Sequence, residues 1–253
     1  MAYVLAIGTG MSPLIEDAVR AYWLGAGYGD VDLARIAALY DRFRRWNRLE
    51  TDGAVAGALE ERRLTLGFQK ALTLIALAEL QSADHLLNPF GGGGGIGRVA
   101  ALRSPAEIVM GDIAYGDAAI ATVGFRLEVE SMWSHWVGAL EQEGLSPPAT
   151  VLRTCHWDAR VLNEEWIGRF RCIVLDPPFG NASARIGMPA RIGKEALLGV
   201  MRHARRYLAS GGRVVAIYPR EWSLQVREEA RTCGLWMREE LLTGRTTRAI
   251  VLG

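Results

Sequence analysis

The stretch His85–Gly97, HLLNPFGGGGGIG, joins a short apolar run to five consecutive glycines and then to a helical pattern that begins near Ile96. A strand, a glycine turn and a helix in this order are typical of an α/β sheet that binds a ligand at the turn. Glycine lets a ligand approach the backbone closely, and the amides that begin the helix face that ligand. Glycine turns alone are weak signals. Five glycines in a non-repetitive chain nevertheless favour binding, because each adds entropy that folding must remove.

The same strand-then-helix order recurs along the rest of the chain. Further short apolar runs are EIVMGD, TVLRTC, RCIVLD and GRVVAIYP, and helical spacing follows over Lys194–Leu208 and Trp222–Cys233. Brief apolar runs alternating with helices predict a doubly wound, largely parallel sheet. The last segment, LWMREELLTGRTTRAIVLG, has two extended runs around TGRT and predicts an antiparallel hairpin. We therefore predict a Rossmann-like α/β fold whose sheet has seven strands and ends in that hairpin.

The beginning of the chain has a different pattern. SPLIEDAVRAYWL and DLARIAALYDRFRRW are amphipathic helices, and Ser12 with Pro13 suits the start of the first one. The helical pattern continues to about Leu80, with Gly67 as a possible break. We predict a mainly helical N-terminal extension over residues 1–66, available for substrate or partner contact, and an α/β domain over residues 67–253.

Composition excludes several classes of protein. A formal net charge of +1 over 253 residues provides no global field toward nucleic acid or membrane. The three cysteines are scattered, so neither a zinc site nor a disulfide framework is expected. No signal peptide and no apolar run of membrane-spanning length is present, and we expect a cytoplasmic protein without metal. Of its 29 basic residues only Lys70 and Lys194 are lysines. Arginine suits phosphate contacts, although genomic composition explains the same bias.

Asp112 is a second candidate ligand-binding residue. It lies in IVMGDIAYG, at the predicted end of the strand after the glycine turn. A carboxylate at this place can accept hydrogen bonds from both hydroxyls of a ribose, and its distance from Asn88 along the chain fits that function. The alternative is a helix N-cap.

VLDPPFGNAS, residues 174–183, is the third candidate. Asp176 ends a predicted strand at the sheet edge where ligands bind. Pro177 and Pro178 fix φ and lack N–H donors, so this turn presents acceptors only. Phe179 adds a flat apolar ring. The set suits a planar group that carries an amine, whose two hydrogens the carboxylate and a proline carbonyl would accept. The alternative is a purely structural turn.

Together these motifs resemble a known family over residues 68–253, the class I S-adenosylmethionine-dependent methyltransferases. The resemblance is closest to the group that methylates exocyclic amines, whose signature is D/N-P-P-Y/F/W. NPFGGGGGIGRVAAL is similar to the D-P-F-C-G-S-G-T-x-x-x-E-A-A-L motif of THUMP-linked tRNA guanine-N2 methyltransferases, and DPPFGNAS is similar to their D-P-P-Y-G-x-S. Asn88, Gly91 and Gly93 depart from that motif, and residues 1–66 do not resemble a THUMP module.

The resemblance implies a cofactor and a set of site residues. The cofactor would be S-adenosyl-L-methionine, with Gly92 and Gly94 along its methionine part, Asp112 at the ribose and Asp158 beside the adenine. The implied cofactor-binding residues are Asn88, Pro89, Phe90, Gly92, Gly94, Asp112, Ile113, Asp158, Ala159 and Asp176. The implied catalytic residues are Asp176, Pro177, Pro178 and Phe179, which would form a clamp around the amine. The expected substrate-binding residues are Phe179, Asn181, Arg185 and Arg191. Arg185 and Arg191 lie in a glycine-containing loop after the clamp, which is a candidate substrate lid.

The implied function is methyl transfer to an exocyclic amine of a nucleobase, with guanine N2 in tRNA or another RNA favoured. The alternatives are DNA adenine-N6 or cytosine-N4 methylation, which uses the same clamp, and a catalytically silent subunit with this fold. The expected partner is nucleic acid, RNA rather than DNA, with a helper protein as a further option. Arginines interleaved with aromatics in YDRFRRWNRLE, namely Arg42, Arg44, Arg45 and Arg48, suit RNA contact or form a solvated helix face.

Overall fold

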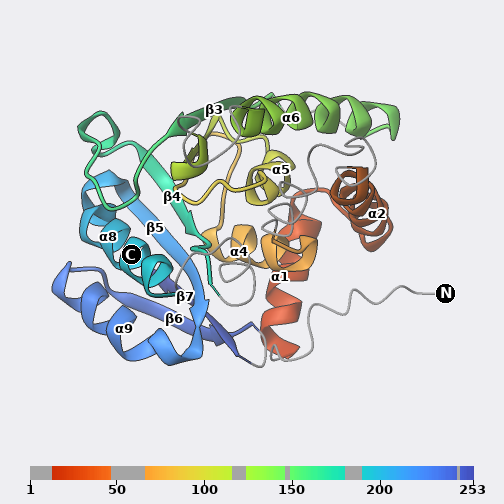
Figure 1. Ribbon diagram of the computed structural model, residues 1–253. Coiled ribbons are helices and arrows are strands. Elements are labelled where there is room, and N and C mark those ends of the chain that lie inside the picture. Colours follow the sequence, from red (N-terminus) through yellow and green to blue (C-terminus); the bar gives the residue numbers. More distant parts are fainter. Residues whose placement is uncertain (1–12, 47–65, 116–123, 146–148, 180–189, 244–245) are drawn as a thin grey trace.

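In the computed structural model, the chain forms one seven-stranded sheet flanked by helices (Figure 1). The structure describes residues 13–46, 66–115, 124–145, 149–179, 190–243 and 246–253. The strands are β1 (His85–Asn88), β2 (Glu107–Asp112), β3 (Val151–His156), β4 (Phe170–Leu175), β5 (Leu208–Pro219), β6 (Met237–Leu242) and β7 (Thr247–Leu252). Their order is β3-β2-β1-β4-β5-β7-β6, and β7 runs antiparallel to both of its neighbours. The predicted fold class, with its C-terminal hairpin, is confirmed.

Helices precede the first strand and connect most of the later ones. They are α1 (Pro13–Gly25), α2 (Asp30–Trp46), α4 (Phe68–Ala78), α5 (Gly95–Ala101), α6 (Gly124–Gln142), α8 (Ala190–Tyr207) and α9 (Ser223–Thr232), with short 3-10 turns η2 (Ile113–Tyr115), η3 (Glu164–Trp166) and η4 (Arg220–Trp222). Gly67 is the residue before α4, at the predicted break. Ser12, the predicted cap of the first helix, lies outside the described residues.

Strand β5 begins earlier than its apolar pattern indicates. The sequence predicts a start near Gly212, whereas pairing with β4 begins at Leu208, opposite Phe170. The register then shifts, so that Cys172 pairs with Arg213. Gly211, at φ +67°, allows the extra residues to bulge out without ending the pairing.

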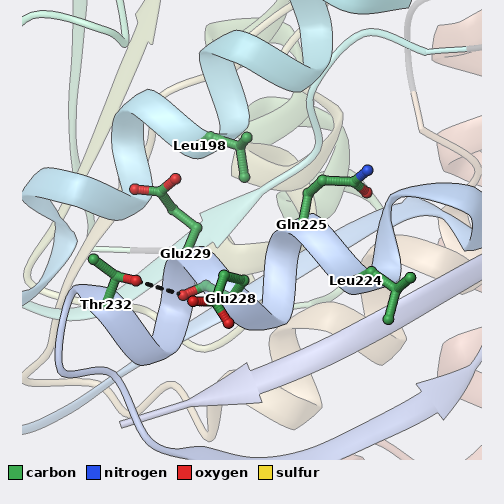
Figure 2. Close-up of a pocket in the computed structure, with 6 residues that line it drawn as sticks. All are labelled: Leu198, Leu224, Gln225, Glu228, Glu229 and Thr232. Carbon is green, nitrogen blue, oxygen red and sulfur yellow. Dashed lines mark hydrogen bonds between the residues drawn. The ribbon is translucent and has the colours of Figure 1, made fainter.

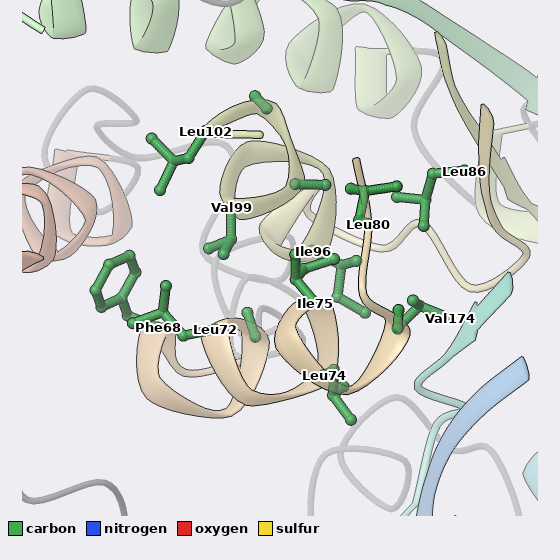
Figure 3. Close-up of a cluster of buried hydrophobic side chains, with 14 of the residues drawn as sticks. Phe68, Leu72, Leu74, Ile75, Leu80, Leu86, Ile96, Val99, Leu102 and Val174 are labelled. Atoms are coloured by element: carbon green, nitrogen blue, oxygen red, sulfur yellow. The ribbon is translucent and has the colours of Figure 1, made fainter. Parts of the chain in front are cut away.

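The sheet separates two hydrophobic clusters, as the alternation of side chains along a strand requires. Leu86 and Val174 face a cluster formed with α1, α2, α4, α5 and α6, whereas Leu87 and Ile173 face a cluster formed with α8 and α9. Figure 3 shows the first cluster, in which Ile75 of α4 and Ile96 of α5 lie near Leu86 of β1. Helices therefore cover both faces, and all three ligand-binding candidates lie at the sheet edge.

The two N-terminal helices contribute to the first cluster. Trp23 of α1 and Tyr40 of α2 are fully buried in it. The Trp23 indole donates to the Leu72 carbonyl of α4 at 3.2 Å, and the Tyr40 hydroxyl donates to the Leu66 carbonyl at 2.8 Å. Residues 13–46 thus share a core with the sheet. The division of the chain at residue 66 into two functional parts stays a prediction.

No described helix has both the length and the apolar character needed to cross a membrane. No cluster of three or more histidine, cysteine or acidic side chains in the described ranges is arranged to hold a metal ion.

Candidate active site

Three predicted groups meet at the carboxyl edge of the sheet. The glycine turn follows β1, Asp112 ends β2, and Asp176 follows β4. Because β1 lies between β2 and β4, these three strand ends are neighbours. Asn88 pairs with Met110 of β2, and Leu87 pairs with Ile173 of β4, so the strands end at nearly the same level. The topology therefore brings together residues that are far apart in the sequence.

The glycine turn is held by its own backbone and by β2. Gly91 N–H donates to the Gly111 carbonyl at 2.9 Å, and Gly94 N–H donates to the Gly91 carbonyl at 2.8 Å. Gly92 and Gly94 have φ values of +46° and +76°, which glycine adopts without strain. These contacts make the turn a defined structure rather than a loose loop.

Tyr115 explains one departure from the family motif. A Cβ atom at Gly91 would lie 2.5 Å from the Tyr115 hydroxyl oxygen, so the cysteine of the motif does not fit here without movement. That hydroxyl donates to the Gly92 carbonyl at 2.7 Å. Burial raises the pKa of Tyr115 well above its usual value, so the phenol stays a donor. The tyrosine occupies the space that the missing side chain leaves and holds the turn.

Asp112 contacts the glycine turn directly. Its Oδ2 accepts a hydrogen bond from Gly92 N–H at 2.8 Å. The next residue, Ile113, is 36% exposed and presents an apolar side chain at the same edge. A carboxylate followed by an exposed aliphatic group suits a nucleoside, whose ribose is polar and whose base is flat.

Asn88, at the end of β1, is 1% exposed. Its Oδ1 accepts from Phe90 N–H at 3.2 Å, whereas its buried Nδ2 has no hydrogen-bond partner within the described residues. Pro89 is buried, and Phe90 is half-buried against the second cluster. A buried donor without a partner is costly, so an acceptor on a bound ligand is a natural partner for it.

Asp158 and Ala159 follow β3, on the far side of β2. The Asp158 carboxylate accepts from Arg160 through Nε at 2.9 Å and the backbone amide at 2.9 Å, and this hydrogen bonding lowers the pKa of the carboxyl. Ala159 is buried in the second cluster. Arg160 therefore already engages the carboxylate that the resemblance places beside the adenine.

Asp176 begins the turn after β4 and is half-buried. Burial raises the pKa of its carboxyl to about 7, and the positive charge of Lys70 in α4 opposes that rise. Pro177 is buried next to it. The result is a carboxyl group whose charge changes near neutral pH.

Helix α8 packs directly on this turn. A Cβ atom at Gly193 would lie 1.9 Å from the Pro178 carbonyl oxygen, so only glycine permits the present approach. Phe179 is half-buried and contacts both hydrophobic clusters. Its ring meets Trp222 of η4 edge-on, with centroids 6.1 Å apart and planes at 79°. The aromatic residue of the clamp is therefore oriented by η4, the 3-10 turn that follows the neighbouring strand β5.

The structure describes the side chain of only one predicted substrate-binding residue, Phe179. Asn181 and Arg185 lie outside the described residues, as does Arg48. The prediction that Arg191 lies in a loop is wrong, because α8 begins at Ala190 rather than at Lys194 and contains it. Arg44 and Arg45 are in α2, and the side chains of all three arginines lie outside the described part. Arg42 is exposed and pairs with Glu143 at 2.9 Å. This arginine has an acidic partner on the protein itself.

Sequence reasoning missed five residues that touch or influence this edge: Lys70, Arg98, Tyr115, Gly193 and Trp222. Some signals were present. Gly193 directly precedes the predicted helix at Lys194, and glycine is the residue that permits a close backbone approach. Lys70 is one of only two lysines in the chain. The contacts of Tyr115 and Trp222 depend on the fold and have no local signature.

One surface hollow lies away from this edge, between α8 and α9 (Figure 2). Its volume is about 410 Å³, and its lining residues are Leu198, Leu224, Gln225, Glu228, Glu229 and Thr232. None of them belongs to the candidate site, and the hollow plays no part in the function argued below.

Comparisons with known proteins define the fold. No protein-family model matches the chain, and no curated protein matches it. Among solved structures, TrmN from Thermus thermophilus aligns with a TM-score of 0.51 and 21% identity, over 79% of this chain and 52% of TrmN. The ribosomal protein L11 methylase from Lactobacillus delbrueckii subsp. bulgaricus aligns with a TM-score of 0.50 and 13% identity, over 76% of this chain and 81% of the other.

The name of a third similar structure indicates a different substrate. Precorrin-6y C5,15-methyltransferase from Geobacter metallireducens aligns with a TM-score of 0.50 and 10% identity, over 76% of this chain and 91% of that protein. Named substrates among these similar structures thus include a ribosomal protein and a precorrin, so the fold does not select the substrate. The strand order and these similarities together show that the chain has the fold of class I methyltransferases.

Proposed function

We propose that this chain transfers a methyl group from S-adenosylmethionine to an exocyclic amine of a nucleobase. The observation that carries the proposal is the adjacency of two turns. The acceptor-only turn at Asp176 follows β4, and the glycine turn follows β1, its hydrogen-bonded neighbour. A methyl donor at one turn and an amine at the other would be side by side.

The residues at the glycine turn fit the proposed cofactor. Gly92 and Gly94 adopt positive φ angles that shape the turn without strain, and Ile113 presents apolar surface next to Asp112. The unpartnered Nδ2 of Asn88 would find an acceptor in an amino-acid carboxylate. When bound, S-adenosylmethionine supplies a methyl group attached to a positively charged sulfur. Asn88, Gly92, Gly94 and Asp112 are the residues that we expect to hold it.

The clamp residues would orient the amine. An exocyclic amine is a poor nucleophile because its lone pair is delocalised into the ring. Hydrogen bonds from its two hydrogens to the Asp176 carboxylate and the Pro177 carbonyl favour a pyramidal nitrogen with a directed lone pair. Alignment of this kind recovers roughly 7–11 kcal/mol of a reaction barrier. Phe179, braced by Trp222, offers a ring on which a base would stack.

Guanine N2 in RNA, most of all in tRNA, is the favoured acceptor. This choice is supported by the resemblance of NPFGGGGGIGRVAAL and DPPFGNAS to the tRNA guanine-N2 group. If the guanine lies within a helix, it must first leave the stack. DNA adenine N6 or cytosine N4 is the alternative acceptor, since the clamp chemistry is the same.

Mass spectrometry of nucleosides tests the acceptor. Total RNA and DNA from cells with and without the protein are digested and compared. Loss of N2-methylguanosine from RNA is the expected result, and loss of a methylated base from DNA alone would overturn the RNA assignment. The purified protein is then given the unmodified nucleic acid, and restoration of the missing base only after addition of a cell extract would indicate a helper protein.

Calorimetry tests the cofactor separately. We expect S-adenosylhomocysteine to bind the purified protein, since it keeps every group that the glycine turn would contact. An absence of binding, in a protein that unfolds cooperatively, would favour a catalytically silent subunit with this fold.

A further inference from the structure

Arg98 lies beneath the glycine turn and is only 3% exposed. It belongs to α5, and its NH1 group donates to the Gly93 carbonyl at 2.8 Å. That same NH1 lies 3.4 Å from the position that a Cβ atom on Gly94 would take. The guanidinium is therefore packed against the inner side of the turn, facing the protein core.

This hydrogen bond completes the fixation of one peptide group. The peptide between Gly93 and Gly94 presents its carbonyl to Arg98, while its N–H donates to the Gly91 carbonyl at 2.8 Å. A trans peptide is planar, and fixing both of its ends fixes its orientation. The flanking glycines resist rotation very little, so these two bonds decide which way this peptide faces.

Helix α2, through Tyr40, contacts the Arg98 guanidinium. The Arg98 guanidinium carbon lies 5.3 Å from the ring centroid of Tyr40 in α2. Trp136 of α6 meets Tyr40 edge-on at 6.1 Å and donates through Nε1 to the Arg98 backbone carbonyl at 3.1 Å. Two aromatic residues from two helices thus hold Arg98 at both its side chain and its backbone.

Burying the Arg98 guanidinium costs free energy, which is unexpected for a residue that serves packing alone. Among the described residues no carboxylate pairs with it, and its buried Nε has no hydrogen-bond partner. A buried charge with so few partners costs stability, and apolar replacements of buried charged groups are often neutral or stabilising. Stability therefore does not account for an arginine at this position.

We infer that Arg98 is a positioning residue for the glycine turn, and that α2, through Tyr40, is part of the cofactor-binding apparatus. The cofactor part of this inference rests on the proposed function. The positioning part does not, because it concerns the conformation of the turn in the ligand-free protein.

The chain offers a matched control at Arg103. This residue also stacks on a tyrosine of an N-terminal helix, with its guanidinium carbon 4.7 Å from the Tyr22 ring centroid. It also donates to a carbonyl, that of Leu80, at 3.1 Å, but it does not contact the glycine turn. Arg98→Met and Arg103→Met therefore remove the same kind of interaction at two places, only one of which is the turn.

Hydrogen exchange of the ligand-free protein is the first measurement. We expect Arg98→Met to accelerate amide exchange in residues 90–97 by about tenfold, the effect of losing one charge-assisted hydrogen bond. Arg103→Met should leave this segment unchanged, and Arg98→Lys should restore part of the protection. Unchanged exchange in a folded Arg98→Met protein would overturn the positioning role.

Calorimetry with S-adenosylhomocysteine and thermal unfolding follow on the same variants. We expect about tenfold weaker binding for Arg98→Met, with a melting temperature equal to or above that of the parent protein, because a strained charge has been removed. Tyr40→Leu should weaken binding in the same direction, and Tyr22→Leu should not. If binding weakens in step with the melting temperature in Arg98→Met, Arg103→Met, Tyr40→Leu and Tyr22→Leu alike, Arg98 is only structural. If the parent protein fails to bind the ligand, the proposed function fails, while hydrogen exchange still decides the role of Arg98.

Discussion

At the scale of the residue, Asp176 combines a proposed acceptor role with a pKa near neutrality. Burial raises the pKa of this carboxyl to about 7, and only the ionised form accepts two hydrogen bonds freely. We expect methyl transfer to rise between pH 6 and pH 8, roughly centred on that value. Asp176→Ala should abolish transfer while S-adenosylhomocysteine still binds. Asp176→Asn keeps an acceptor oxygen, so it should retain some transfer with a flat pH profile. An inactive Asn variant would instead indicate that Asp176 removes a proton.

The raised pKa of Asp176 also predicts how the stability of the folded protein changes with pH. Its pKa in the folded state exceeds the value of about 3.9 expected when unfolded, so the folded protein binds the additional proton between these values. The stability contributed by this group is fully present below the unfolded pKa and is lost as the pH rises through about 7. Asp176→Asn should therefore gain stability relative to the parent as the pH is raised from 5 to 8, measured by thermal unfolding. A constant difference over that range would contradict the burial of the charge.

Asp112 is expected to matter for binding rather than for transfer. Its carboxylate accepts from Gly92 N–H, so Asp112→Ala removes both a proposed ribose contact and a support of the turn. We expect the affinity for S-adenosylhomocysteine to fall by about 1–3 kcal/mol, the usual effect of leaving hydrogen-bonding partners unsatisfied. Asp158→Ala is the comparison, and its effect should be smaller because Arg160 already engages that carboxylate. Equal losses in calorimetry would mean that Asp158 contacts the cofactor as strongly as Asp112 does, in spite of its pairing with Arg160.

At the scale of the element, α8 is packed so closely that it controls the position of the clamp. Gly193→Ala would direct a methyl group at the Pro178 carbonyl, and either the helix or the turn must move. We expect transfer to fall by at least about tenfold, since small displacements in a reacting site are costly, while S-adenosylhomocysteine still binds. Gly138→Ala in α6 is the matched control, because nothing lies within 4 Å of its added methyl.

The control variant Gly138→Ala should itself change the thermal stability of the protein. Gly138 lies inside a helix, where alanine is more favourable by roughly 0.5–1 kcal/mol, so the melting temperature should rise. Loss of transfer in both glycine variants would mean that helix rigidity, rather than the contact with Pro178, governs activity.

The elements themselves could be predicted from the sequence because their patterns are local. HLLN, EIVMGD and RCIVL are short apolar runs typical of buried strands, and the structure has β1, β2 and β4 there. The early start of β5 could not be predicted, since Leu208 belongs by pattern to the helix before it. Its pairing with Phe170 depends on a bulge that exists only within the sheet.

At the scale of the whole molecule, the N-terminal helices are joined to the sheet by a shared core. Deletion of residues 1–66 would remove Val19, Trp23, Leu33, Ile36, Leu39 and Tyr40 from that core. Each such side chain contributes roughly 1.5–3 kcal/mol by burial, and the sum approaches the full stability of a typical domain. We expect the fragment 67–253 to be insoluble or to lack a cooperative thermal transition. A fragment that unfolds cooperatively and binds S-adenosylhomocysteine would show that the α/β part is independent.

The candidate site could be predicted only where its residues are consecutive. The glycine turn and the turn at Asp176 are short motifs, and the order of the strands brings them together as expected for this fold. The support that α2 gives to the turn was not predicted. Tyr40 begins the stretch YDRFRRWNRLE, whose arginines suit either RNA contact or a solvated helix face, yet this tyrosine is fully buried against Arg98. A side chain that stacks on a nucleobase and one that stacks on a guanidinium have the same appearance in a sequence.

The two lysines have a practical consequence for chemical labelling. Lys70 is exposed and influences the charge of Asp176, and Lys194 directly follows the glycine that contacts Pro178. Every other basic side chain in the protein is an arginine or a histidine, which amine-selective reagents leave largely unmodified. Acylating or cross-linking reagents would therefore attach, apart from the α-amino group, at no more than two positions, both in the segments that border the clamp. A fluorophore or a spin label introduced in this way would report on ligand binding at that edge without any engineered cysteine.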